Sequence, residues 1–179
     1  LMIHAVEASP HPEKADAAAD ALRDLQPGLG HLVHMPSHID VRRGRWQEAI
    51  DANAKAMEAD RRYTARSPEQ GFYRLYMAHN HHMLTYAAMM TGQSALALKT
   101  IREMVAGIPL EVVKENPWAD GFLAMPLEVL MRFGKWDEIL GEPELPEFAP
   151  ISRSLQHYAR AVAYASKGNV AAAETEQSA

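Results

Sequence analysis

The sequence predicts an all-α protein made of about five antiparallel helical hairpins that follow one another along the chain. Apolar residues recur at helical spacing in successive segments. Between paired segments a glycine is followed five residues later by a small or apolar residue, as in Gly44-Arg-Trp46-Gln-Glu-Ala49. Glycine directly after a helical apolar segment is typical of a helix end, because it can adopt the left-handed backbone that ends many helices.

The same turn pattern returns at long intervals. Pro10, Gly44, Gly92, Gly134 and Gly168 are separated by 34, 48, 42 and 34 residues, and Pro10 takes the place of a glycine. The two longer intervals predict insertions near residues 61–76 and 106–120, where Ser67-Pro68-Glu69-Gln70 has the composition of a helix start. A helix-turn-helix unit that recurs every 34 residues resembles the tetratricopeptide repeat (TPR).

The resemblance implies a right-handed superhelix of hairpins over residues 1–27, 30–60, 78–108, 120–140 and 154–179. If each turn glycine is repeat position 15, the family's small residues fall at positions 8, 20 and 27. The second unit has Ser37, Ala49 and Ala56 there, and the third has Thr85, Ala97 and Met104. The fourth unit departs from the pattern with Leu127 and Ile139, and its second helix should be short because Gly141, Pro143 and Pro146 follow. Segments 30–39 and 132–140 resemble a bacterial group of repeat proteins with no assigned activity.

The beginning of the chain predicts that this repeat domain is a fragment of a longer protein. Leu1 falls at repeat position 6, so the first helix lacks its opening turn, and residues 1–9 lack a polar capping unit. We therefore expect truncation at the N-terminus, with further repeats upstream in the natural chain. The alternative is a degenerate first helix that begins at Leu1.

Composition excludes several functions. The chain has 18 basic and 23 acidic residues and a formal net charge of −5, which argues against a nucleic-acid partner. The chain contains no apolar run of about 18 residues, the length that would predict a membrane span. The absence of cysteine excludes disulfides and thiolate metal ligands.

The histidines carry the most specific signal. In the repeat register, positions 2, 5 and 9 of the first three units provide seven places within the chain, and the resemblance implies that these positions face the concave groove. With nine histidines in 179 residues, chance would put fewer than one histidine in seven places. Six of the seven are histidine and the other is tyrosine: His4, His31, His34, His38, His79, His82 and Tyr86.

Histidines at this spacing favour a metal site. His34 and His38 are four residues apart and share one face of a helix, and neutral imidazole binds zinc or copper. Ligands from a neighbouring helix would complete the site. The candidate metal ligands are His34, His38, His79 and His82. Glu128, at groove position 9 of the fourth unit, and Glu7, at position 12 of the first, are candidates for a carboxylate ligand, a hydrogen-bonding partner or a general base.

Three functions remain open from the sequence. The first is a binding module that holds a protein, peptide or small molecule in the histidine-lined groove, with or without a transition metal such as zinc or copper. The second is a metal-dependent enzyme with Glu128 or Glu7 as base. The third is a scaffold for protein–protein interaction whose histidines are structural. Prolines at repeat position 7, Pro36 and Pro126, predict a kink or restart within two first helices.

Overall fold

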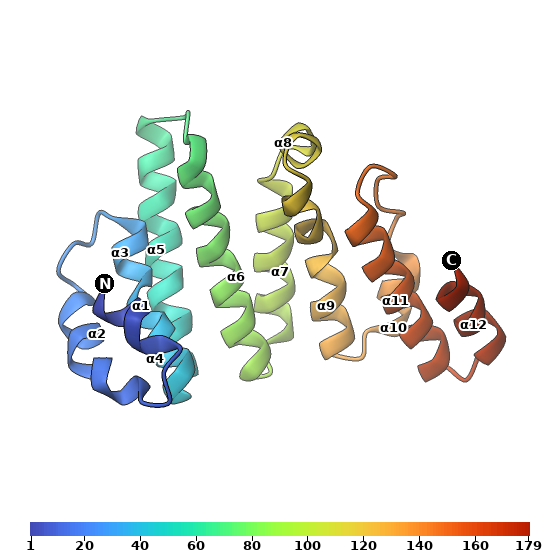
Figure 1. Cartoon of the computed structure of the whole chain (residues 1–179), viewed down its shortest axis with the longest axis horizontal. Helices are drawn as coiled ribbons and strands as arrows, with labels where there is room; N and C mark the ends of the chain where they lie inside the picture. The colour runs from blue at the N-terminus through green and yellow to red at the C-terminus, as the bar shows by residue number, and fades with distance from the viewer. The chain divides into compact units, whose positions relative to one another are not determined.

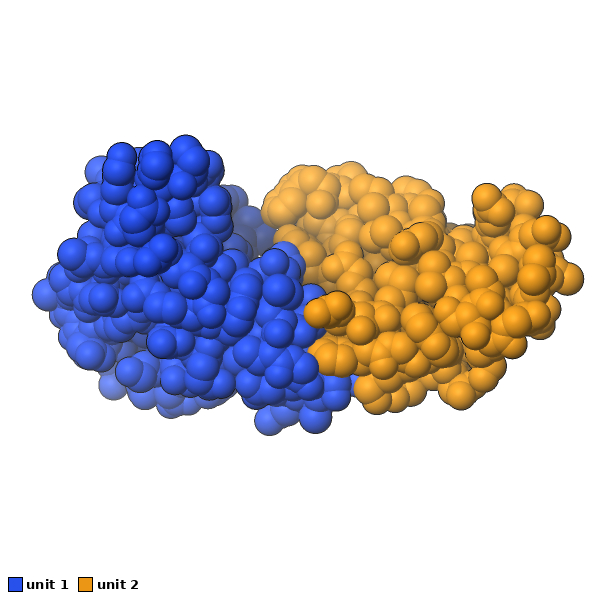
Figure 2. Space-filling model, turned by 90° about the horizontal axis from the view of Figure 1, so that it is seen from below, with its two compact units in different colours: residues 1–100 blue, residues 101–179 orange.

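The computed structural model describes all residues, 1–179, and contains helices and no strands (Figure 1). This confirms the all-α prediction. The chain divides into two compact units, Leu1–Thr100 and Ile101–Ala179, which are coloured separately in Figure 2. None of the helices combines the length and the apolar composition that a membrane crossing requires.

The first unit is built around a long central helix. In chain order its α-helices and 3-10 helices (η) are α1 (Met2–Glu7), η1 (Pro12–Ala15), α2 (Asp16–Leu22), α3 (Gly30–His34), α4 (Pro36–Arg43), α5 (Trp46–Arg66), η2 (Gly71–Tyr73) and α6 (Arg74–Met90). Helix α5 packs against α3, α4 and α6, and α1 packs against α4. Helix α7 (Ser94–Ala106) runs across the boundary between the units.

Proline divides the first helix of the second hairpin, as the sequence predicts. Helix α3 ends at His34, and α4 begins at Pro36. Proline has no backbone N–H, so it cannot continue the hydrogen-bond ladder of α3. Met35 keeps a helical backbone, with φ −49° and ψ −38°, and its N–H donates to the carbonyl of His31. The chain therefore continues in nearly the same direction while the helix restarts.

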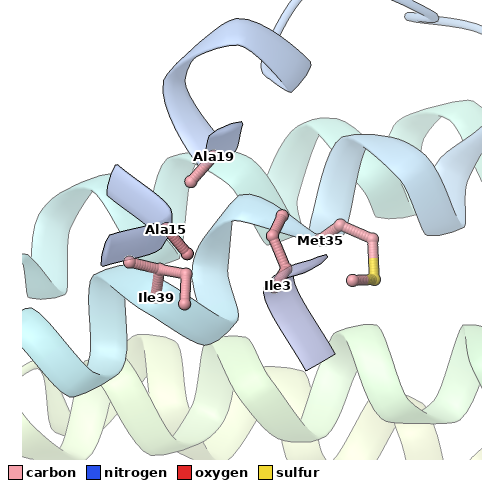
Figure 3. Packing of buried hydrophobic residues seen from close by; sticks show 5 residues of the cluster. All are labelled: Ile3, Ala15, Ala19, Met35 and Ile39. Atoms are coloured by element: carbon pink, nitrogen blue, oxygen red, sulfur yellow. The ribbon is translucent and has the colours of Figure 1, made fainter. Parts of the chain in front are cut away.

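A small apolar core holds the N-terminal helices against α4 (Figure 3). Ile3 from α1, Ala15 and Ala19 pack against Met35 and Ile39, and each of these side chains is at most 5% exposed. Burying an aliphatic side chain contributes about 1.5–3 kcal/mol. This core fixes α1 beside α4, which determines where Glu7 lies at the end of α1.

The predicted hairpin turns have the expected backbone. Gly44 has a φ of 71° and Gly92 a φ of 75°, in the left-handed region where other residues are strained. The backbone N–H of Arg45 donates to the carbonyl of Asp40, and that of Gln93 donates to the carbonyl of Ala88. Each turn thereby satisfies a carbonyl that the preceding helix leaves free.

The first predicted insertion differs from the expected helix start. Residues 67–70 are not helical, and the chain becomes helical again only at Gly71. The side-chain amide of Gln70 donates to the carbonyl of Ser67, so these residues form a local loop. The expectation that Ser67 and Pro68 begin a helix was wrong, because the next helix begins only at Gly71.

The second unit contains α8 (Leu110–Glu115), η3 (Pro117–Ala124), α9 (Met125–Arg132), α10 (Trp136–Gly141), α11 (Pro150–Ser166) and α12 (Val170–Ser178). Helix α10 has only six residues, as expected from the glycine and prolines that follow it. The buried carboxylate of Asp120 accepts the backbone N–H groups of Ile151 (2.6 Å) and Ser152 (3.0 Å). It thereby pairs two of the free N–H groups at the start of α11.

Replacement of a core side chain should destabilise the first unit. Ile39 is fully buried, so Ile39→Ala leaves a cavity and should lower the free energy of unfolding by about 2–5 kcal/mol. The matched control is Ile151→Ala, because Ile151 is 51% exposed and a surface change usually costs about 0.5 kcal/mol or less. Urea unfolding followed by circular dichroism measures both. Equal losses would contradict the core described above.

Candidate functional site

Five of the predicted histidines form one cluster in the first unit. We use "histidine cluster" for His4 on α1, His31 and His34 on α3, His38 on α4 and His79 on α6. The ring of His34 lies 4.6 Å from that of His38 and 4.7 Å from that of His79, measured between centroids. The ring of His4 lies 4.7 Å from that of His38, and the ring of His31 lies 5.5 Å from that of His34. Four helices therefore bring imidazole rings to one place.

Three members of the cluster offer converging nitrogen atoms. His34, His38 and His79 each have a ring nitrogen within 4.8 Å of the other two. We call this set the histidine triad. Tetrahedral zinc with Zn–N bonds of 2.0–2.1 Å places its nitrogen ligands roughly 3.3 Å apart. Small side-chain rotations would therefore bring the triad around one ion.

The environment of His34 fixes which of its nitrogens carries the proton. The ring is fully buried, and its Nδ1 lies 2.8 Å from the side-chain oxygen of Asn53. The amide orientation of Asn53 is set by its Nδ2, which donates to the carbonyl of Ala49 at 2.8 Å. Because the amide oxygen only accepts, Nδ1 of His34 must be the donor. The lone pair of the neutral ring is therefore on Nε2.

Glu7 fixes which ring nitrogen of His38 carries the proton. A carboxylate oxygen of Glu7 lies 2.5 Å from Nδ1 of His38, and the other oxygen lies 2.7 Å from Nδ1 of His4. The guanidinium of Arg42 donates to the backbone carbonyls of Glu7 and Ser9, which holds the end of α1 against α4. An ionised carboxylate only accepts, so Nδ1 of His38 donates to it. The lone pair of neutral His38 is then on Nε2.

These assignments place two lone pairs against each other. The Nε2 atoms of His34 and His38 are 2.9 Å apart, the distance of a hydrogen bond. With Nδ1 as the donor on both neutral rings, no hydrogen remains to lie between the Nε2 atoms. An extra proton between the two Nε2 atoms would relieve this opposition, and so would a metal cation that bound both of them after a small separation of the rings.

Burial disfavours the extra proton. Removal from water, together with the charge that His38 would carry when protonated, lowers the pKa of His34 to about 2. Burial also lowers the pKa of His79 to about 4, assisted by the charge of His38. The pKa of His38 is lowered by burial too, although Glu7 acts in the opposite direction. The triad therefore favours neutral imidazoles, the form that binds metals.

His31 forms the side of the cluster away from His38. Its ring stacks on that of His34 and meets Tyr76 edge-on at 4.6 Å. Its Nδ1 is buried without a hydrogen-bond partner, and burial lowers its pKa. We infer that His31 shields one face of His34 from water.

The other predicted site residues, His82, Tyr86 and Glu128, are not part of the histidine cluster. His82 lies one turn after His79 on α6, and its charge contributes to the lowered pKa of His79. The ligand atoms within 4.8 Å of one another belong to the triad, or to His4, Glu7 and His38, so His82 is in neither group. Tyr86 packs edge-on against Trp46 at 5.9 Å, with 39% of its surface exposed. Glu128 is exposed on α9 in the second unit.

Sequence reasoning missed the residues that orient His34. Asn53 and Ser37 both contact its Nδ1, at 2.8 and 3.3 Å. A signal for Asn53 was present, because it shares the helical spacing of Ala49 and Ala56 and so falls on the buried face of α5. A buried amide on such a face needs a polar partner.

Comparison with models of known families, with curated proteins and with solved structures finds no match to this chain.

Stability of the metal-free chain should depend on pH through the triad. Below pH 6.5 the unfolded chain protonates His79, whereas the folded chain keeps it neutral down to about pH 4. The unfolded state then binds more protons than the folded state. The free energy of unfolding therefore decreases as the pH is lowered, by about 1.4 kcal/mol per pH unit for each such histidine. His79→Gln should reduce this slope between pH 6.5 and 5.

The measurement is urea unfolding with a chelator present at several pH values. His11→Gln is the matched control, because His11 is an exposed histidine outside the cluster. A slope that is the same in His79→Gln and in the unchanged chain would show that His79 is not held neutral.

Proposed function

We propose that this chain is a TPR-like binding module in which the histidine triad holds a transition metal ion. The ion in turn contacts a protein, peptide or small-molecule ligand. The observation that carries the proposal is the 2.9 Å contact between the Nε2 atoms of His34 and His38, whose neutral rings both present lone pairs there. A cation accepts both lone pairs, and His79 supplies a third.

The donor set favours zinc or copper. Neutral imidazole nitrogen suits both ions, whereas calcium and magnesium prefer oxygen ligands. Three histidines leave a fourth position on tetrahedral zinc, as in zinc sites that bind water or a substrate. That position is where a ligand's own donor atom would bind.

Asn53 and Glu7 suit the same role. In histidine metal sites the second ring nitrogen commonly donates to a carbonyl or carboxylate, which fixes the ring and makes the ligand nitrogen more basic. His34 donates to the Asn53 amide oxygen, and His38 donates to Glu7. Both rings are therefore oriented before any ion binds.

Local packing supports the TPR-like part of the proposal. The residues at repeat position 20, Ala49, Ala97 and Ile139, are all fully buried. At position 8, Ser37 and Thr85 are at most 1% exposed. The small residues among these, Ala49, Ala97, Ser37 and Thr85, allow the paired helices of the second and third hairpins to approach closely, whereas Ile139 of the fourth unit is buried but large. A right-handed superhelix of such hairpins is the arrangement we propose, and a crystal structure of the chain tests it.

A metal-dependent enzyme is the second candidate, favoured by the position that three ligands leave free. Such a site could activate a bound water molecule. The bound ion distinguishes the two functions. X-ray absorption that shows a water ligand displaced by an added peptide or small molecule supports binding, and turnover of a hydrolysable substrate supports catalysis.

Metal binding is tested on untagged protein, because a histidine tag would itself bind ions. We expect elemental analysis after dialysis to find about one zinc or copper ion per chain. In titration calorimetry His79→Gln should weaken zinc binding by at least about 100-fold, more than the loss of an orienting partner does. His157→Gln is the matched control, because His157 pairs with Glu176 in the second unit. Unaltered zinc affinity in His79→Gln would exclude the triad.

Replacement of an orienting partner should have a smaller effect. Asn53→Ala removes the acceptor of His34 Nδ1 and should weaken zinc binding by about 10–100-fold. Asn169→Ala, an asparagine at the start of α12, is the control. If Asn53→Ala bound zinc as tightly as the unchanged chain, His34 would not be the oriented ligand proposed here. Thermal unfolding of each variant checks that it is folded.

A further inference from the structure

A second feature of the first unit is a cavity that none of the triad residues line. Its volume is about 320 Å³, near the lower end for small-molecule sites. Its walls are mainly apolar or aromatic, from Leu29, Leu32, Tyr63 and Tyr73, and His31 and the acid Asp60 are also part of its lining. This combination of an apolar space and a single acid suggests a specific kind of ligand.

Asp60 is a buried acid that pairs with no lysine or arginine. Only 4% of its surface is exposed. One carboxylate oxygen accepts the hydroxyl of Tyr73 at 3.0 Å, and the other accepts the amide of Asn80 at 2.7 Å. No lysine or arginine of the chain forms an ion pair with it, so both of its donors are neutral groups.

Asp40, the other deeply buried aspartate of this unit, has the arginine partners that Asp60 lacks. Asp40, which is fully buried, accepts two hydrogen bonds from the guanidinium of Arg23, at 2.9 and 2.6 Å. Its Oδ1 also lies 3.0 Å from Nε of Arg45. A buried carboxylate is costly unless it is paired with a cation. At Asp60 no guanidinium takes this place. Burial raises the pKa of Asp60, while its hydrogen bonds and the charges that His81 and His31 would carry act in the opposite direction.

Close packing keeps Asp60 in this position. A Cβ added at Gly30 would lie 2.0 Å from Oδ1 of Asp60, so the backbone of α3 lies directly against the carboxylate. Hydrogen bonds from Tyr73 and Asn80 hold its two oxygens from α6 and the segment before it. The carboxyl group is therefore held in a fixed position beside the cavity.

We propose that this cavity binds a small primary amine in its ammonium form, with Asp60 as the counter-ion and the apolar part of the amine against Leu29 and Leu32. Tyr63 and Tyr73 add aromatic faces, which attract cations. The cavity shares His31 with the histidine cluster, but none of the proposed metal ligands lines it.

An ammonium fits better than a guanidinium. Arginine-like groups bind carboxylates through two parallel hydrogen bonds and need both oxygens accessible. Here each oxygen already accepts one hydrogen bond, and little of the side chain is exposed. A primary ammonium is compact and can donate to one remaining lone pair.

The test is calorimetric titration with hexylammonium chloride, with a chelator present so that no metal contributes. We expect saturable binding of one hexylammonium per chain and none of hexanol, which has the same tail without the charge. Asp60→Asn should weaken binding at least about tenfold. Asp24→Asn, at an aspartate whose side chain is 89% exposed, should leave the affinity unchanged.

Asp60→Asn should fold, because the side-chain oxygen of Asn80 is buried without a partner and can accept the new amide after a rotation of Asn80. A second pair of variants does not depend on this rotation. Tyr63 is 47% exposed, so Tyr63→Ala should fold while weakening amine binding, and Tyr63→Phe should restore it. Absence of saturable binding, equal binding of hexanol, or unchanged affinity in Asp60→Asn would overturn the proposal.

Discussion

The histidine cluster depends on one hydrogen bond, between Nδ1 of His34 and the side-chain oxygen of Asn53. This bond pairs the Nδ1–H of a fully buried, neutral imidazole. It directs the lone pair on Nε2 of His34 toward His38. It also fixes the register of α3 against α5. A shift of α5 by one residue would turn Asn53 by about 100° and leave a buried N–H unpaired, at a cost of about 1–3 kcal/mol.

Polar side chains specify the rest of the first unit in the same way. Asp40 connects α4 to Arg23 and Arg45, and Arg42 connects α4 to the end of α1. The apolar contacts of α1 are few and small, so burial alone would allow several arrangements. Hydrogen bonds to buried acceptors favour one of them, because a displaced helix would leave those acceptors unpaired. Glu7 contacts His38 as a consequence of this network.

The sequence predicted the parts of this structure that depend on neighbouring residues. Helical spacing, turn glycines and Pro36 gave the helices and the restart, and the spacing of His34 and His38 placed both on one face. Contacts between distant segments could not be predicted from spacing. Glu7 meets His38 across 31 residues, and Asn53 meets His34 across 19. The loop at Ser67 was missed because residues 67–70 have the composition of a helix start, although the helix begins only at Gly71.

The triad draws its nitrogens from three helices, α3, α4 and α6, and this has a thermodynamic consequence. An ion bound by all three helices binds the folded unit and not the dispersed ligands of an unfolded chain, so it stabilises the fold by an amount that grows with its concentration. The same geometry explains why the three nitrogens of the triad do not all come from one helix. Two histidines on a continuous helix would bind an ion in the unfolded chain's transient helices as well. The contribution of α6 would make ion binding conditional on the packed structure.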